Sequence, residues 1–275
     1  MNLYSEEKRM NKRNIGKKAF LLILFIYLII PVIATILFSF AGKWDTSVMP
    51  ESFTLRYYVT IFSDPDFVTS LLRSVVISIA AGLISVIVII PSVYIGVLHY
   101  PKLIKFFEIL AMLPFIMPGV VLAIGLISLY SQLPIDITGT VWILLGAYFI
   151  LCLPFTFQTV RNSFRSISSK NLVEAAMMLG CSESSAFIRV IIPNVSNGII
   201  SALLLDVSVI FGDFVLVNLL AGNAYPTVQM YMFNQLTKDG HIASAIVTVY
   251  LLTIFIISFI TFSLTNKKRH RVEAK

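Results

Sequence analysis

Six long apolar runs limit what this chain can fold into. Each is about 20 residues long, which at about 1.5 Å per residue crosses a hydrocarbon core of about 30 Å. The runs cover residues 19–41, 71–97, 106–130, 138–156, 198–220 and 242–264. The sequence therefore predicts an all-α membrane protein with six transmembrane helices.

The composition and the placement of charge agree with this topology. Only 13% of the residues are charged and 57% are hydrophobic, whereas about a quarter of an ordinary soluble domain is charged. A net charge of +7 would suggest nucleic acid as the partner of a soluble chain, but here the basic residues gather at both ends and in particular loops. When loops are assigned to alternate sides, most of the 21 Lys and Arg residues fall on one side. The exceptions are Lys43, Arg56, Arg73 and Lys238. This asymmetry predicts a multi-pass protein with both termini in the cytoplasm.

The same asymmetry divides the chain into three parts. Residues 1–18 are predicted to be a cytoplasmic basic tail, residues 19–265 a single transmembrane domain, and residues 266–275 a second cytoplasmic basic tail. Prolines inside the spans each remove a backbone hydrogen bond, so we expect them to kink their helices. These prolines are Pro31, Pro91, Pro114, Pro118 and Pro154.

A polar but ordered stretch, residues 174–193, lies between the fourth and fifth spans. Four residues at the start of this stretch and just before it have the spacing of one helical face, namely Leu172, Ala175, Ala176 and Leu179. Gly180 is predicted to end this helix, because glycine readily adopts the left-handed conformation that closes a last turn. The neighbouring Met177 and Met178 are predicted to fill the helix rather than to contact a partner.

A second short helix is predicted after Gly180. Ser182 is a suitable N-cap, and Glu183 places an acid in the first turn. One side of this helix carries three apolar residues, Phe187, Val190 and Ile191. Pro193 is predicted to end the helix, because proline cannot continue the hydrogen-bond ladder. The stretch is therefore expected to form two amphipathic helices joined by a tight turn.

This stretch resembles the EAA loop of the permease subunits of bacterial ABC importers. The family pattern is Glu-Ala-Ala, three residues, Gly, nine residues, then Ile-x-Leu-Pro. The matching residues are Glu174, Ala175, Ala176, Gly180 and Pro193, and Val190 and Ile192 replace the two aliphatic residues conservatively. The resemblance implies a type I importer permease fold, called MetI-like, with a cytoplasmic coupling helix between spans 4 and 5. Residues 168–193 would then be the EAA coupling loop of a single permease domain.

The resemblance also implies partners and roles. The loop would dock into a groove of a separate ABC ATPase subunit, with Glu174 fixing orientation, Ala175 and Ala176 allowing close approach, and Gly180 making the turn. A second permease subunit, identical or different, would complete the pathway in the bilayer of the bacterial inner membrane, and an extracytoplasmic binding protein would deliver the cargo. Helix-in-groove docking suits an amphipathic helix.

Two aspartates in the fifth predicted span are candidates for the substrate path. Asp206 and Asp213 are seven residues apart, so on one helix they would project within about 20° of each other. A carboxylate at mid-membrane costs at least about 2.5 kcal/mol and normally faces a cavity or a partner. They would favour a cationic cargo such as a polyamine; alternatively, either could be protonated or bonded to a hydroxyl or lysine of the partner permease.

The segment from Phe211 to Gly222, followed by Tyr225, resembles the branch of permeases for spermidine and putrescine, ferric iron, thiamine and aminoethylphosphonate. The family resemblance leaves the choice among these cargoes open. A different class of protein, an ion-coupled secondary transporter or a channel, would instead use the two aspartates to bind ions directly.

Other kinds of site are not predicted. The chain has no Gly-x4-Gly-Lys-Ser/Thr loop, so ATP would be bound by a partner and this subunit would be non-catalytic, without a cofactor of its own. His99, His241 and His270 lie far apart in sequence and are each expected to be solvated at an interface rather than to bind metal. Cys152 and Cys181 suggest neither a zinc site nor a disulfide.

Overall fold

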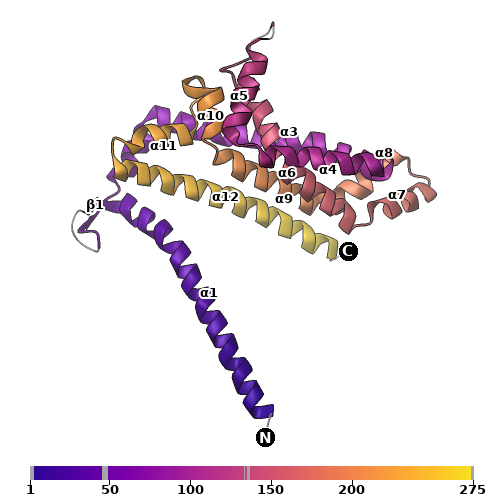
Figure 1. Ribbon diagram of the computed structural model, residues 1–275, viewed down its shortest axis with the longest axis horizontal. Coiled ribbons are helices and arrows are strands. Elements are labelled where there is room, and N and C mark those ends of the chain that lie inside the picture. Colours follow the sequence, from indigo (N-terminus) through magenta and orange to yellow (C-terminus); the bar gives the residue numbers. More distant parts are fainter. Residues whose placement is uncertain (1–2, 45–48, 133, 135–136, 274–275) are drawn as a thin grey trace. The chain divides into compact units, whose positions relative to one another are not determined.

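The computed structural model describes residues 3–44, 49–132, 134 and 137–273 of the 275-residue chain, and Figure 1 shows that its elements are almost all helices. Five of the described helices are long and apolar enough to span a membrane, and a sixth span is present if one sharply bent pair counts as one. The predicted all-α membrane fold is confirmed. Most side chains of the two predicted basic tails lie outside the described part.

The chain divides into two units, and the first contains residues 1–63 and 235–249. It includes α1 (Leu3–Phe40), a small antiparallel pair of strands, β1 (Ala41–Lys43) and β2 (Ser52–Phe53), then α2 (Arg56–Ser63), and the first part of α12 (Gly240–Glu273). The ring of His241 stacks on Phe38 at 4.0 Å and on Tyr57 at 4.9 Å between centroids. His241 is therefore partly buried between two aromatic rings from distant parts of the sequence, which its predicted solvation did not include.

The second unit contains residues 64–234 and 250–275 and is built on three long helices that pack on one another: α3 (Pro65–Leu98), α6 (Val141–Ser166) and α9 (Ile192–Phe211). Asp64 caps α3 by accepting from the Asp66 N–H at 2.9 Å. Two glycines permit close approach: Gly82 of α3 faces α9, and Gly198 of α9 faces Ser163 of α6. Small residues at helix contacts are the usual way for membrane helices to pack closely.

The predicted spans 106–130 and 198–220 are not continuous helices, so both predictions were wrong in this respect. The first consists of α4 (Pro101–Ile116) and α5 (Gly119–Tyr130), bent by 104°. Met117 is extended with ψ of 124°, as expected for a residue before a proline; the kink predicted at Pro118 is therefore a full break. The second predicted span contains most of α9, a break at residues 212–214, and α10 (Val215–Leu220).

Between α6 and α9 lie α7 (Ser169–Met178), α8 (Glu183–Ala186) and a π-helical turn, η1 (Phe187–Ile191). After α10 come a 3-10 turn, η2 (Gly222–Ala224), and α11 (Val228–Leu236). The predicted fourth span, 138–156, corresponds to α6, which starts at Val141 and continues ten residues further to Ser166.

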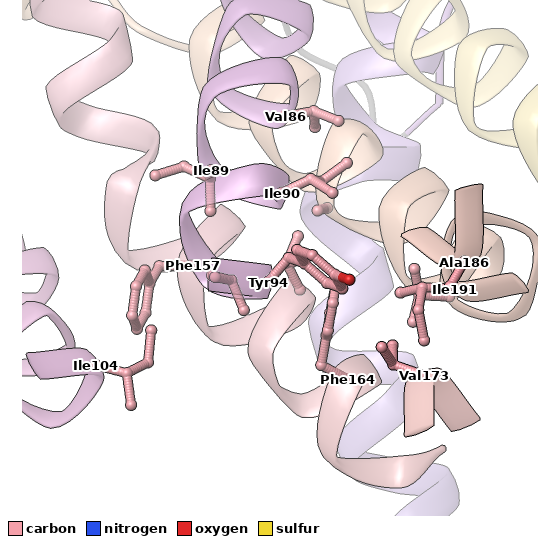
Figure 2. Close-up of a cluster of buried hydrophobic side chains, with 14 of the residues drawn as sticks. Val86, Ile89, Ile90, Tyr94, Ile104, Phe157, Phe164, Val173, Ala186 and Ile191 are labelled. Atoms are coloured by element: carbon pink, nitrogen blue, oxygen red, sulfur yellow. The ribbon is translucent and has the colours of Figure 1, made fainter. Parts of the chain in front are cut away.

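The second unit has two separate hydrophobic cores. The proximal core lies next to α7, α8 and η1 (Figure 2) and includes Ile90, Val93, Phe164, Val173, Ala186, Ile191 and Val195. The distal core lies at the other end of α6 and includes Ile77, Ala81, Ala123, Ala147, Tyr148, Leu216 and Val217. The proximal core therefore supports the predicted coupling loop, whereas the distal core contains both helices that follow a break, α5 and α10.

Candidate functional site

The turn after α7 has the geometry that the sequence predicted. Gly180 has φ of +88°; its N–H donates to Met177 O at 2.9 Å, and the Cys181 N–H donates to Ala176 O at 3.1 Å. These two bonds form a Schellman motif, which uses a left-handed residue to satisfy the last carbonyls of a helix. The predicted helix stop at Gly180 is confirmed.

The second helix begins as predicted but does not end as predicted. Ser182 caps α8, since its Oγ accepts from the Ser185 N–H at 3.4 Å. Pro193, however, lies in the first turn of α9, and residues 183–211 form one uninterrupted helical segment. In η1 the Ile192 N–H donates to Phe187 O, five residues back. The wider turn leaves room for the ring of Pro193, and its missing N–H is tolerated near a helix start.

The apolar face of α7 is divided between the chain itself and solvent. Val173 and Ala176 are buried in the proximal core, whereas Ala175 is exposed. Met178 is 89% exposed and Leu179 is 87% exposed; that Met178 fills the helix rather than contacting a partner stays a prediction. Among the large apolar side chains of the described residues, these two are the most exposed.

Glu174 is exposed on α7, and its Oε1 lies 3.9 Å from the Nζ of Lys170 one turn earlier. This exposed pair lies within one helix and contributes little to stability. The carboxylate can therefore be given up to a partner at small cost. We call the segment from residue 168 to residue 193 the EAA loop.

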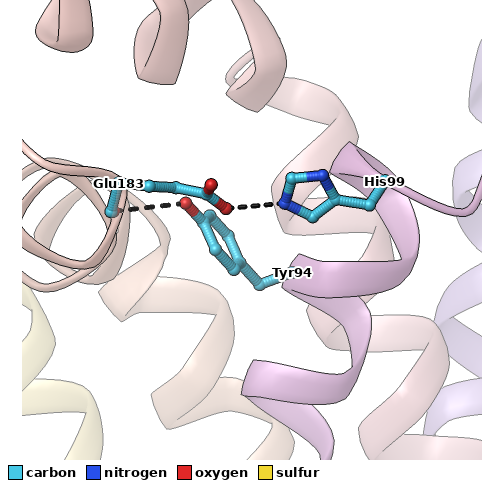
Figure 3. A network of polar contacts seen from close by, with 3 residues as sticks. All are labelled: Tyr94, His99 and Glu183. Carbon is cyan, nitrogen blue, oxygen red and sulfur yellow. Dashed lines mark hydrogen bonds and ion pairs between the residues drawn. The ribbon is translucent and has the colours of Figure 1, made fainter.

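The EAA loop is tied to the end of α3 by a small polar network (Figure 3). The Tyr94 hydroxyl donates to Glu183 O at 3.4 Å, and His99 Nε2 lies 2.7 Å from Glu183 Oε1. The Tyr94 ring also lies 4.4 Å from the Phe187 ring. His99 is exposed, as predicted for a solvated side chain, and it also contacts Glu183, which was not predicted. Sequence reasoning missed this contact because 84 residues separate the two side chains and neither belongs to a motif.

Asp206 lies on α9, inside the bundle, with none of its surface exposed. Its Oδ2 accepts a hydrogen bond from Thr156 Oγ1 of α6 at 2.5 Å, and its Oδ1 has no hydrogen-bond partner among the described residues. Gly82 of α3 packs close to its Cβ. The local arrangement matches the alternative in which a hydroxyl holds the carboxyl group.

Asp213 does not share a helix face with Asp206, so that prediction was wrong. It lies in the break between α9 and α10 and is partly buried. Its Oδ2 accepts from the Tyr148 hydroxyl at 3.2 Å, from the Leu216 N–H at 3.0 Å and from the Val217 N–H at 3.3 Å. The carboxylate thus satisfies free N–H groups at the start of α10 and joins them to α6.

Metal and thiol chemistry have little support in the described part of the chain. Among those residues, no three His, Cys, Asp or Glu side chains are grouped so that they could hold a metal ion. Cys152 is buried and Cys181 is exposed, and both are free. His270 lies among the side chains that the structure does not describe.

The fold and the loop define the class of protein. Residues 89–271 match the family model of the binding-protein-dependent transport system inner membrane component, and the chain belongs to this family of ABC importer permeases. Over 96% of the chain and 99% of the other chain, it superposes with a TM-score of 0.73 and 18% identity on a chain of a bacterial ABC transporter involved in the import of the acidic polysaccharide alginate. The predicted importer permease fold is confirmed.

Two curated relatives cover most of the chain. A putative 2-aminoethylphosphonate transport system permease protein, PhnV of Salmonella paratyphi A, is 27% identical over 234 residues, which are 84% of this chain and 87% of the relative. The spermidine/putrescine transport system permease protein PotC of Haemophilus influenzae is 24% identical over 259 residues, 92% of this chain and 98% of the relative. The predicted resemblance to this branch of permeases is confirmed.

Proposed function

We propose that this subunit, with a second permease subunit, forms the path for a small cargo that carries a protonated amine, and that separate ATPase subunits drive it through the EAA loop. An extracytoplasmic binding protein would deliver the cargo. The observation that carries the coupling role is the exposure of Met178 and Leu179 at the end of α7. The Gly180 turn presents them beside Glu174, while Val173 and Ala176 hold the same helix on the proximal core.

The decisive variant for coupling is Gly180→Asp. An added Cβ at Gly180 meets no atom of this chain within 4 Å, so the new side chain points into the space where we place the ATPase. The buried carboxylate would lower affinity by several kcal/mol if left unpaired. We expect ATP-dependent uptake and co-purification of the cognate ATPase to be lost, with normal membrane insertion.

Gly139→Asp is the matched control, because Gly139 also has a positive φ, of +72°, and also has open space around its Cβ. It carries the same backbone strain but lies far from the EAA loop in sequence. Normal uptake by Gly180→Asp, or an equal loss in both variants, would contradict the coupling role.

The cargo proposal combines the relatives with the charges near the distal core. Aminoethylphosphonate, spermidine and putrescine all carry a primary amine that is protonated at neutral pH, and Asp213 is a partly exposed carboxylate that could pair with it. Asp206 would reach cargo only if α3, α6 and α9 separated, since it has no exposed surface here. The Cζ of Arg73 lies 5.2 Å from the ring centroid of Tyr225, which packs against the same core; this cation favours a cargo that also carries an anionic group, such as an aminophosphonate, over a polyamine.

Charge-neutral variants test the cargo proposal. We expect Asp213→Asn to lower the uptake of both amines and Arg73→Gln to lower the uptake of aminoethylphosphonate but not of putrescine. Asp206→Asn is expected to have the smaller effect of the two aspartate variants. Unchanged uptake and unchanged preference in Asp206→Asn and Asp213→Asn would rule out the substrate-path role for both residues.

The proposed orientation places the EAA loop and both termini in the cytoplasm of a bacterial cell. Cys181 lies in the EAA loop and is exposed, whereas Cys152 is buried, so the native thiols report on the side of this loop. A membrane-impermeant maleimide should label Cys181 in inside-out vesicles and not in intact spheroplasts, and Cys181→Ser should abolish the labelling. Labelling of spheroplasts would reverse the proposed topology.

A further inference from the structure

Two helices of the second unit are each interrupted by a break, and each continues beyond the break as a shorter helix. One break is at Met117 and Pro118 between α4 and α5; the other is at residues 212–214 between α9 and α10. Figure 1 shows α5 pointing away from the line of α4, with α10 beside it. Breaks in the helical hydrogen-bond ladder concentrate bending at a few residues, so each break is a candidate hinge.

The two segments beyond the breaks pack on each other. A Cβ added to Gly119, the first residue of α5, would lie 3.9 Å from the Cβ of Val215, the first residue of α10. α5 packs more extensively on α10 than on α6 or α4. Segments that contact each other closely and leave their own helices at neighbouring points are suited to move together.

Asp213 supplies the side-chain hydrogen bonds that join α10 to α6, and a backbone bond from the Gly139 N–H to Leu220 O at 3.0 Å ties the end of α10 to the residues just before α6. Asp213 Oδ2 accepts from the N–H groups of Leu216 and Val217, which belong to α10, and from the hydroxyl of Tyr148, which belongs to α6. The other distal-core contacts are apolar and involve small side chains, such as Ala81, Ala123 and Ala147, as well as large ones, such as Leu144 and Leu216. Apolar contacts have no fixed direction, whereas the hydrogen bond from Tyr148 must break when α10 moves away from α6.

We infer that α5 and α10 form one gate segment that moves about the two breaks, and that Tyr148 is a positioning residue that latches this segment to α6 through Asp213. The role of this movement in transport rests on the proposed function, whereas the movement itself can be tested without it. It assigns Tyr148 a role that uses a hydrogen bond, whereas the cargo proposal assigns Asp213 a role that uses charge.

Tyr148→Phe removes the latch while keeping the ring and the capping bonds of Asp213. With spin labels at Leu129 of α5 and Trp142 of α6, both exposed, the purified wild-type chain should give one narrow distance distribution. The variant should give a second population, because losing one such interhelical bond shifts a two-state equilibrium roughly three- to tenfold. Tyr130→Phe makes the same chemical change on α5, where no hydrogen bond of the hydroxyl is recorded among the described residues, and should leave one population. A single unchanged distribution in Tyr148→Phe would overturn the latch.

A disulfide tests whether α5 and α10 move as one body. Gly119→Cys with Val215→Cys, in a Cys181→Ser background, has a Cβ separation of 3.9 Å, within the range of native disulfides. The crosslink should form on mild oxidation and leave uptake unchanged. If the crosslink does not form, or if it abolishes uptake and a reductant restores it, α5 and α10 do not move as one body. If Asp213→Asn transports normally while Tyr148→Phe shows the second population, the cargo role fails and the latch stands. If Asp213→Asn loses uptake while Tyr148→Phe keeps a single population, the latch fails and the cargo role stands.

Discussion

The proximal and distal cores of the second unit show how one set of membrane helices can be made rigid at one end and divided at the other. In the proximal core, α3, α6 and α9 run as unbroken helices, and Gly82 and Gly198 let them approach closely. In the distal core, two helices are interrupted, and short segments held by side-chain bonds replace them. A movement of the EAA loop would therefore be passed on by the continuous helices α3, α6 and α9, and the chain would bend at the two breaks.

The largest effect on stability is expected from adding a methyl group at the close contact of Gly198 with α6 in the proximal core. In Gly198→Ala the new methyl group would overlap the Ser163 side chain on α6, and such overpacking costs about 3 kcal/mol at the upper end. We expect a clear loss of thermal stability in detergent. Ser163→Gly in the same chain should restore much of it, and Gly146→Ala, where the added Cβ meets open space, should be neutral. Equal stability of Gly198→Ala and wild type would show that the proximal core is not rigid.

Replacing a buried alanine by leucine should have opposite effects on stability in the two cores. Ala123 is fully buried in the distal core, so Ala123→Leu should cost about 2 kcal/mol by overpacking. Ala111 instead lines an apolar pocket of about 230 Å³ together with residues of α3 and α6, so Ala111→Leu should be neutral or gain about 0.5 kcal/mol. The unfolding midpoints of both variants measure this difference. A shift of the midpoint in the same direction in both variants would contradict a difference in packing between the two cores.

A smaller loss is expected where the two cores meet. Thr156→Val removes the donor to Asp206 Oδ2 and leaves a fully buried carboxyl group without its hydroxyl partner. Interhelical hydrogen bonds of this kind contribute about 0.6 to 1.7 kcal/mol in membrane proteins. Thr159→Val, one turn along α6, is the control, and the two should differ in thermal stability by about 1 kcal/mol. Indistinguishable stabilities would mean that Asp206 does not join α6 to α9.

The smallest effect on stability is expected from the contact between the end of α3 and the EAA loop. His99→Ala removes the contact to Glu183, which is worth less than about 1 kcal/mol because both side chains are well exposed. Global stability should be unchanged, while hydrogen exchange of the α8 amides should become a few times faster. Lys102→Ala, a change at an exposed basic residue in the first turn of α4, should leave this exchange rate as it is. If both variants behave alike, the network in Figure 3 does not anchor the loop.

Local features of the loop were predictable because their causes are local. Gly180 is left-handed and Ser182 caps a helix for reasons that lie within four residues of each. The end predicted at Pro193 was wrong because the π-helical turn at Phe187–Ile191, directly before α9, accommodates the ring, and no local rule predicts such a turn. Periodicity placed Leu179 on one helical face with Ala175 and Ala176, yet only Ala176 of these three is buried, because burial depends on which side the proximal core occupies.

The sequence by itself determined the class of fold: runs of about 20 apolar residues can satisfy their backbone only as helices in lipid. It also determined the turn at Gly180 and the family to which the chain belongs. Only the tertiary structure decided the environments of Asp206 and Asp213. Their seven-residue spacing predicts one face on a continuous helix, but the packing of α10 on α5 and α6 stabilises a break between them. The structure therefore places Asp206 inside the bundle and Asp213 at a joint between helices, because contacts between distant segments outweigh the periodicity of a single one.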